Sequence, residues 1–195
     1  MKKKFSPREI IIPTLVLLVI GVVAAALLGG TNMLTKDKIA SIDAEARAKA
    51  MALVMPDAEK FGEEKEADEK MTYTPALNSD GDVIGYAFSV STSGYGGEIR
   101  LMVGINADGT VNKVTVLAAD NETPGLGQNI KKDNFLSQFA GKSKILTVVK
   151  NAVSSDSEIQ AVTSATISST AATKTVNAAI EYFNANLKEG GNRNG

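Results

Sequence analysis

The sequence predicts an α+β protein: a single N-terminal transmembrane helix, followed by one domain in which helices pack on a twisted, mostly antiparallel sheet. Three observations support this fold class. Residues 10–28 are 19 consecutive positions without a charged side chain. Residues 98–119 hold two alternating apolar runs around the turn sequence NADGT. Between residues 172 and 187, apolar residues recur at helical spacing.

The first element is the transmembrane helix, which we predict over residues 10–30. A helix needs roughly 20 apolar residues to cross the hydrocarbon core, and Gly29 and Gly30 extend the uncharged run to that length. Pro13 falls in the first turn, where a missing N–H does little harm. A cleavable signal peptide is the alternative, but its apolar stretch usually covers only about 7–15 residues. We therefore expect an uncleaved span.

Residues 1–9 form a basic segment that sets the orientation of this span. Lys2, Lys3, Lys4 and Arg8 outnumber the single acidic residue, Glu9. Positive charge favours the cytoplasmic side, so we expect a cytoplasmic N-terminus and an extracytoplasmic domain at the cell membrane. The whole chain carries a net charge of −1. Because the remainder is mildly acidic and has no basic cluster, we expect no nucleic-acid partner.

Residues 31–71 are predicted to lead from the membrane into the domain. The segment 34–54 is expected to be an amphipathic helix that Pro56 ends. Residues 57–70 are almost all charged, which favours a solvated connector or an exposed helix. The predicted apolar face of the helix contains Leu34, Ile39, Ile42, Ala46, Ala50 and Leu53.

Residues 72–188 are expected to form the folded domain, and residues 189–195 a polar tail. A turn at NSDGD (78–82) precedes a strand that contains Val83, Tyr86, Phe88 and Val90. The alternating runs in 98–119 predict a hairpin. A short helix is expected over 129–139 and a strand over 144–150. The apolar face of the last helix contains Ala172, Val176, Ala179, Ile180, Phe183 and Leu187.

The sequence contains no cysteine and no histidine. Disulfides, iron–sulfur clusters and thiolate zinc sites need cysteine. A Ser-His-Asp triad and ordinary haem or zinc ligation need histidine. Redox or metal chemistry would therefore have to use a bound organic cofactor or oxygen ligands alone.

Two glycine-rich segments are candidates for a binding site. SGYGGEI (93–99) places three glycines between two strands, which permits positive φ and close approach to the backbone, although a flexible hairpin loop would also use them. ETPGLGQNI (122–130) combines a rigid Thr-Pro turn with two glycines that flank Leu126, and it runs into a helix start. It is not the phosphate loop of nucleotide hydrolases, because no Gly-Lys-Ser/Thr sequence follows.

The third candidate segment is TSATISST (163–170), which holds six hydroxyl side chains. It opens the last helix, where serine and threonine cap free backbone N–H groups. The same N–H groups and the positive end of the helix dipole can bind a phosphate, to which a threonine there could be esterified. The residues alone do not choose between capping and phosphate attachment.

The three segments, in this order behind one N-terminal span, resemble the FMN-binding G subunit of Rnf-type ion-translocating electron-transport complexes. The domain is also similar to the C subunit of the sodium-translocating NADH:quinone reductase. That family carries FMN on a motif Asp-x-x-Ser-Gly-Ala-Thr-x-Ser/Thr, where a flavin transferase esterifies the FMN phosphate to the threonine. The resemblance implies that Thr166 is the acceptor, that Thr163, Ser164 and Ala165 precede it in the motif, and that Ser168 and Ser169 follow as caps or phosphate neighbours.

Other positions also follow from the resemblance. It implies that Glu122, Thr123, Gly125, Leu126 and Gly127 lie beside the flavin. Two motif positions differ from the family: Ser164 replaces the glycine and Gln160 replaces the aspartate. If the glycine position has positive φ, serine adds strain of about 1 kcal/mol or more.

The resemblance implies an electron carrier within a complex rather than a complete enzyme. The complex would couple electron transfer between ferredoxin and NAD to sodium or proton transport. Expected partners are the lipid bilayer, the other membrane and redox subunits, and the flavin transferase. One alternative is a flavin-free extracytoplasmic binding or sensory domain on the same fold.

A pilin-like structural protein is a further alternative, because KFSPRE (4–9) before an apolar run resembles the start of type IV pilins. The pilin pattern has a glycine before the phenylalanine, where Lys4 stands, and an apolar opening, where Pro7 and Arg8 stand.

Overall fold

The computed structural model describes residues 7–188, which form two compact units. The first unit extends to Glu45 and the second begins at Ala46. The predictions for residues 1–6 and for the tail 189–195 lie outside the described part. The domain therefore begins earlier than the predicted start at residue 72, because the end of the first helix and two short strands pack with the sheet.

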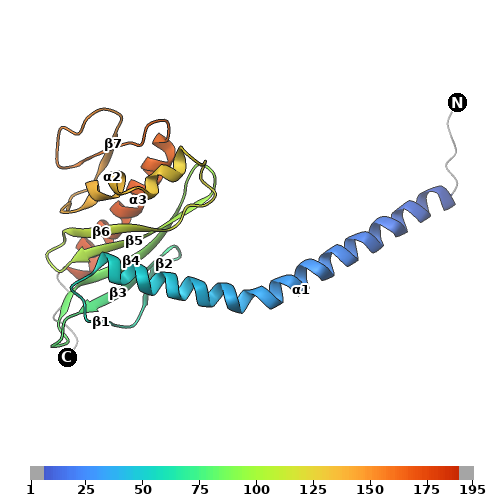
Figure 1. The fold of residues 1–195 in the computed structure, drawn as a ribbon, viewed down its shortest axis with the longest axis horizontal. Helices are drawn as coiled ribbons and strands as arrows, with labels where there is room; N and C mark the ends of the chain where they lie inside the picture. The colour runs from blue at the N-terminus through green and yellow to red at the C-terminus, as the bar shows by residue number, and fades with distance from the viewer. Residues whose placement is uncertain (1–6, 189–195) are drawn as a thin grey trace. The chain divides into compact units, whose positions relative to one another are not determined.

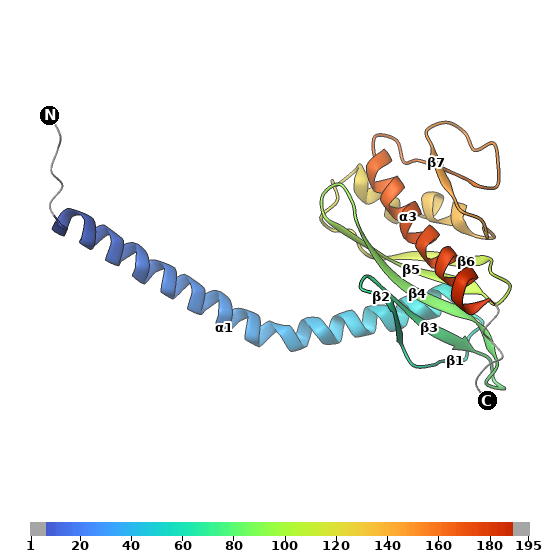
Figure 2. The same ribbon diagram turned by 180° about the vertical axis from the view of Figure 1, so that it is seen from behind.

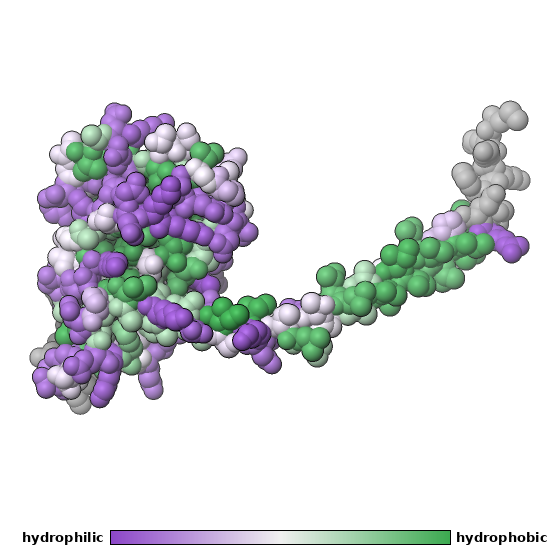
Figure 3. Space-filling view, viewed as in Figure 1, coloured by the Kyte–Doolittle hydropathy of each residue, from purple (hydrophilic) through white to green (hydrophobic). Residues whose placement is uncertain are grey.

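Helix α1 (Pro7–Val54) is one continuous helix, not the two predicted ones. It passes through Gly29 and Gly30 without a break and ends two residues before Pro56. Its N-terminal part is long and apolar enough to cross a membrane, and its side chains there are exposed, as the predicted span requires. Figure 3 shows this part as an almost unbroken hydrophobic surface.

The helix predicted over residues 34–54 is confirmed as the C-terminal part of α1. Of the six residues of its predicted apolar face, only Ala50 is buried, whereas Leu34 is 85% exposed. The side chains that pack on the domain are Ala50 and Val54, with Met51 partly buried beside them. Within the second unit, the last turns of α1 therefore pack against the sheet.

A six-stranded antiparallel sheet forms the centre of the second unit. The strand order is β1-β3-β4-β5-β6, and β2 also pairs with β3. This confirms the predicted fold class and the hairpin predicted over residues 98–119. The strands are β1 (Lys60–Phe61), β2 (Lys65–Asp68), β3 (Met71–Leu77), β4 (Val83–Ser93), β5 (Glu98–Asn106) and β6 (Val111–Ala118).

The charged segment 57–70 is neither an exposed helix nor a plain connector. It supplies β1 and β2, which both pair antiparallel with β3. Their side chains are mostly exposed, and charged side chains on an edge strand oppose pairing with other chains. The high content of charged residues therefore led to a wrong prediction for a segment that contains two strands.

The β5–β6 hairpin closes through the predicted NADGT turn. Gly109 has φ of 91°, a conformation that glycine adopts without steric cost. The Thr110 hydroxyl and backbone N–H donate to Asp108, and they hold the pKa of that carboxyl below its ordinary value. The turn residues and the alternating side chains of the two strands therefore both fit the observed hairpin.

Helices pack on both faces of the sheet. Helix α3 (Thr166–Tyr182) packs on one face through Ala172, Val176, Ala179 and Ile180, as its spacing predicted. The end of α1 packs on the other face, around Met102. Figure 1 shows the end of α1 in front of the sheet. Figure 2, seen from the opposite side, shows α3 in front of the sheet.

The segment between β6 and α3 is mostly irregular. The helix predicted over 129–139 is broken into three short pieces, and the strand predicted over 144–150 is confirmed in a shorter form that pairs parallel with another short strand. A π-helical turn follows α3. These elements are η1 (Gly127–Lys131), α2 (Asp133–Leu136), η2 (Ser137–Phe139), β7 (Thr147–Val149), β8 (Glu158–Gln160) and η3 (Phe183–Leu187).

Candidate functional site

A cleft of about 530 Å³ lies where the three glycine- and hydroxyl-rich segments meet. This volume is within the range of small-molecule sites, about 300–1,000 Å³. None of the residues that line it, among those the structure describes, is charged. The lining residues are Tyr95, Thr123, Leu126, Gly127, Ser164, Ala165, Thr166, Ile167 and Ser168.

One carboxylate beneath the cleft joins all three segments. Glu122 is 1% exposed. Its Oε1 accepts the backbone N–H groups of Tyr95 at 2.8 Å and Gly96 at 3.0 Å. Its Oε2 accepts the Ser168 hydroxyl at 2.5 Å. The loop 94–97, the loop that begins at Glu122 and the start of α3 are therefore held at one point.

The glycines of this region are required by close approach to neighbouring atoms. A Cβ on Gly96 would lie 1.9 Å from the backbone oxygen of Asn121, and one on Gly127 would lie 2.4 Å from Oε2 of Glu122. Gly125 instead has positive φ, 75°, as its turn position suggested. The loop 94–97 is the hairpin loop between β4 and β5, and it is packed against its neighbours.

Helix α3 begins at Thr166 without a side-chain cap. Its N-cap residue is Ala165, and the first backbone N–H groups of a helix have no partner within the helix. They lie at the positive end of the helix dipole, at a residue that lines the cleft. This arrangement can hold an anion such as a phosphate.

Ser168 and Ser169 were predicted as caps or phosphate neighbours, and neither caps the helix, because no side chain bonds to its start. The Ser168 hydroxyl donates to Glu122. The Ser169 hydroxyl donates to the Ala165 carbonyl at 2.9 Å and accepts the Val162 N–H at 3.0 Å. Both hydroxyls therefore have partners within the domain, and a position beside a phosphate stays a prediction.

Ser164 has φ of 61° and is the one non-glycine residue with positive φ among residues 7–188. Ser164 stands where the motif of the resembling family has glycine. Because its φ is positive, the strain expected for a non-glycine residue in this conformation, about 1–2 kcal/mol, applies here. Ser164 is exposed, so the strain comes from the backbone and not from crowding.

Substituting Ser164 therefore has a predictable order of effects. Ser164→Gly relieves this strain but adds unfolded-state entropy of about 0.5–1 kcal/mol, so we expect stability equal to or slightly above that of the wild type. Ser164→Val should lower stability by at least about 1 kcal/mol, because a β-branched side chain disfavours positive φ further. Denaturant unfolding of the three proteins measures the order; a valine variant as stable as the glycine variant would contradict it.

The structure brings most of the predicted site residues together. Thr123, Leu126, Gly127, Ser164, Ala165, Thr166 and Ser168 line the cleft, and Glu122 lies beneath it. Gly125 and Ser169 are not among the lining residues. Thr163 lies on a separate cleft of about 310 Å³, together with Gln160 and Lys132.

Sequence reasoning missed two residues of the cleft. Tyr95 is 68% exposed and Ile167 is 58% exposed, and with Leu126, 43% exposed, they give the cleft three exposed apolar side chains. We call these three residues the apolar rim. The sequence contains a signal for both residues. Tyr95 stands between glycines, and Ile167 is the one large apolar residue within TSATISST. The apolar rim and the uncapped helix start together fit a planar aromatic ring that carries a phosphate.

Comparison with protein families gives two matches along the chain. The RnfG N-terminal region matches residues 1–54, and the FMN-binding domain matches residues 94–181. The second match includes the loop 94–97, Glu122 and the start of α3. All residues of the cleft therefore lie within the part that matches an FMN-binding domain.

Two curated relatives are similar over most of their length. Both are G subunits of ferredoxin:NAD(+) oxidoreductase complexes. The relative from the Na(+)-translocating complex of Acetobacterium woodii is 37% identical over 186 residues, which cover 87% of this chain and 89% of the relative. The relative from the proton-translocating complex of Clostridium ljungdahlii is 37% identical over 169 residues, 86% of each chain.

A solved structure supports the fold. The crystal structure of Shewanella oneidensis NqrC matches with a TM-score of 0.52 at 17% identity, over 68% of this chain and 72% of the other. At this identity the match concerns the fold alone.

Proposed function

The chain belongs to the family of G subunits of Rnf-type ion-translocating oxidoreductase complexes, and from this membership we propose that it is a membrane-anchored electron-transfer subunit carrying FMN on Thr166. The complex would be a ferredoxin:NAD oxidoreductase whose electron transfer drives ion transport. The other membrane and redox subunits of that complex are the partners of this chain. The chain is a redox carrier in this assembly and not a complete enzyme.

The observation that carries the proposal is the position of Thr166. It is the first residue of α3, it lines the cleft, and no side chain caps the helix there. A phosphate esterified to its hydroxyl would lie at the free N–H groups of the first turn, where backbone dipoles stabilise negative charge. Attachment by a flavin transferase would form the P–O ester bond at the Thr166 hydroxyl oxygen while the phosphoanhydride bond of a flavin dinucleotide donor breaks, so that a nucleoside monophosphate leaves and the hydroxyl proton is released.

The chain's own residues suit the remaining parts of FMN. Bound FMN supplies the redox chemistry, while the protein supplies position and electrostatics. The apolar rim offers Tyr95, Leu126 and Ile167 to an aromatic ring. Because Ser168 donates its proton to Glu122, its oxygen can act only as an acceptor toward the cleft, which suits a hydroxyl of the ribityl chain.

We further propose that residues 10–30 cross the cell membrane with the N-terminus in the cytoplasm and the FMN domain outside. The basic residues before the span support this orientation. Small residues on α1 would let helices of other subunits approach closely. A Cβ at Gly21 or Gly29 would meet no atom within 4 Å, so these positions are open to a neighbour. The small residues are Gly21, Ala24, Ala25, Ala26 and Gly29.

A flavin-free binding or sensory domain is the second candidate. The strained backbone at Ser164 and the glutamine at position 160 are the observations that favour it, because both depart from the motif that carries FMN. Family membership leaves no support for the pilin-like alternative.

Purified membranes test the proposal against this second candidate. Membranes from cells that contain the chain and a flavin transferase should show a flavin-fluorescent band of about 20 kDa after denaturing electrophoresis, and ferredoxin-dependent NAD reduction that is lost when the chain is deleted. The flavin-free candidate would be favoured if the chain has its unmodified mass and if membranes without the chain keep full activity.

A further inference from the structure

We propose that Glu122 is a positioning residue for FMN: its carboxylate latches the loop 94–97 to the start of α3, and its negative charge disfavours reduction of the flavin. The latch is a property of the chain itself. The effect on reduction rests on the proposed function, because it requires FMN in the cleft.

The latch follows from three hydrogen bonds to one buried side chain. Oε1 of Glu122 accepts from two consecutive backbone N–H groups, those of Tyr95 and Gly96, and Oε2 accepts from Ser168. Ser168 is 46 positions further along the chain. The carboxylate therefore links two segments that the backbone alone does not connect, and it fixes the loop that carries the exposed ring of Tyr95.

The glycines around the carboxylate show that the loop closes tightly on it. A Cβ on Gly94 would lie 2.2 Å from Oε1 of Glu122, and one on Gly127 would lie 2.4 Å from Oε2. Both glycines thus leave room for this side chain and no more. The space that a larger residue would fill is occupied by the carboxylate, so its position is set from both sides.

The hydrogen-bond partners of Glu122 fit an ionised carboxylate. All three partners donate to Glu122, which is the pattern that an ionised carboxyl accepts. Ser168 contacts the carboxylate and also lines the cleft, so one side chain separates the charge from the cleft. No charged side chain of the described chain lines the cleft itself. An electron added to a flavin there would be repelled by a buried negative charge that water screens weakly.

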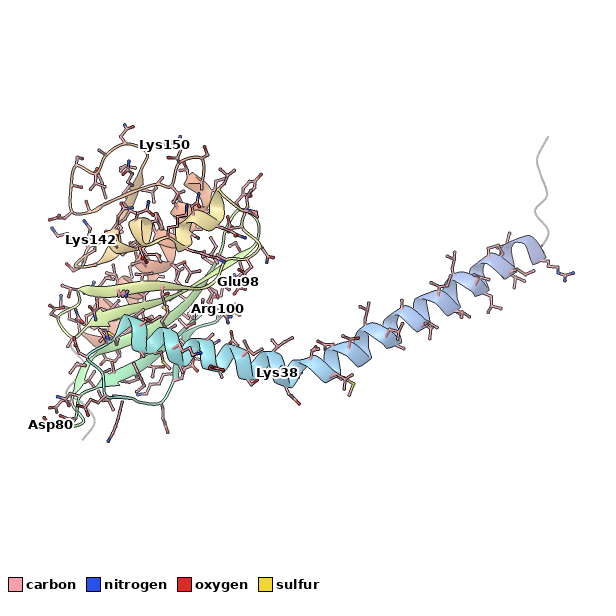
Figure 4. All side chains as sticks on the ribbon, in the orientation of Figure 1. Lys38, Asp80, Glu98, Arg100, Lys142 and Lys150 are labelled. Carbon is pink, nitrogen blue, oxygen red and sulfur yellow. The ribbon has the colours of Figure 1, made fainter. Side chains whose placement is uncertain are left out.

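Glu122→Gln separates the latch from the charge. The two backbone donors require the amide oxygen of the glutamine on their side, so its NH₂ group faces Ser168 and can donate to the Ser168 oxygen. The latch is then kept with one bond reversed, while the charge is removed. Glu122→Ala removes both. Glu98→Gln is the matched control: Glu98, labelled in Figure 4, is an exposed carboxylate at the start of β5 on the same hairpin.

The experiment uses the full chain in detergent and has two readouts. Amide hydrogen exchange at Tyr95 and Gly96, measured without flavin, reports the latch. Glu122→Ala should exchange at least about tenfold faster at both amides, the factor expected when a hydrogen bond to a charged group is lost. Glu122→Gln and Glu98→Gln should exchange as the wild type does.

The second readout is the midpoint potential of FMN in the flavin-loaded chain. Glu122→Gln should shift it to a more positive value, because reduction no longer adds charge beside a carboxylate, and Glu98→Gln should leave it unchanged. Wild-type exchange in Glu122→Ala would overturn the latch, and a wild-type potential in Glu122→Gln would overturn the charge effect. If the wild type binds no FMN, the proposed function and the charge effect both fail, whereas the exchange comparison still decides the latch.

Discussion

Thr166→Ala is expected to abolish covalent attachment of FMN completely, while the domain remains folded. The substitution removes the hydroxyl that forms the ester bond, and no other group at this position can replace it. Alanine is a good helix former, and Thr166 is the first residue of α3, so stability should change by less than about 1 kcal/mol. Intact-mass measurement and in-gel flavin fluorescence after denaturation report the adduct.

Two neighbouring threonines provide matched controls for this variant. Thr163 lies on a different cleft, and Thr170 lies a full turn further along α3. Thr163→Ala and Thr170→Ala should therefore both keep the adduct. An adduct that survives in Thr166→Ala, or that disappears in Thr170→Ala alone, would assign the attachment to another residue.

Gly96→Ala is expected to have the largest effect on stability. The added Cβ would lie 1.9 Å from a backbone oxygen, that of Asn121, and a backbone atom cannot move aside as a flexible side chain can. Overpacking typically costs about 1–3 kcal/mol, and we expect the upper end of this range because the contact is with a backbone atom. The loop 94–97 would also leave its place against Glu122, so the cleft should lose its affinity for FMN. Denaturant unfolding of the full chain in detergent and flavin titration measure both effects.

Gly62→Ala is the control for a glycine that tolerates a methyl group. The nearest atoms to its added Cβ belong to Pro75 at 3.5 Å, which is ordinary contact, and its φ is not positive. Its stability should stay within about 0.5 kcal/mol of the wild type. Equal stability of Gly96→Ala and Gly62→Ala would show that the loop is not packed as the structure has it.

The elements that sequence predicted well have a pattern that matches their burial. The β5–β6 hairpin has alternating side chains and an Asp-Gly turn, and α3 places one apolar face on the sheet. Strands β1 and β2 were missed because short edge strands with charged side chains resemble solvated segments. The helix over residues 34–54 was also predicted, and its last turns pack on the sheet through Ala50 and Val54.

The candidate site was predictable by parts but not as a whole. The three segments could each be chosen for their glycines or hydroxyls, and the possible strain at Ser164 followed from its place in the motif. The link between Glu122 and Ser168 could not be predicted, since it joins residues 46 positions apart and no local pattern encodes it. Tyr95 and Ile167 were missed because their importance depends on exposure at a cleft that only the fold creates.

The position of the covalent bond is the most direct test of the proposed function. The chain should be purified from membranes that contain the flavin transferase, digested, and analysed by tandem mass spectrometry for the peptide that contains residues 163–170. We predict that the mass of the FMN phosphoester is found on Thr166 in the wild type. A peptide without the adduct, or an adduct on Thr163, Ser168 or Thr170, would contradict the proposed attachment.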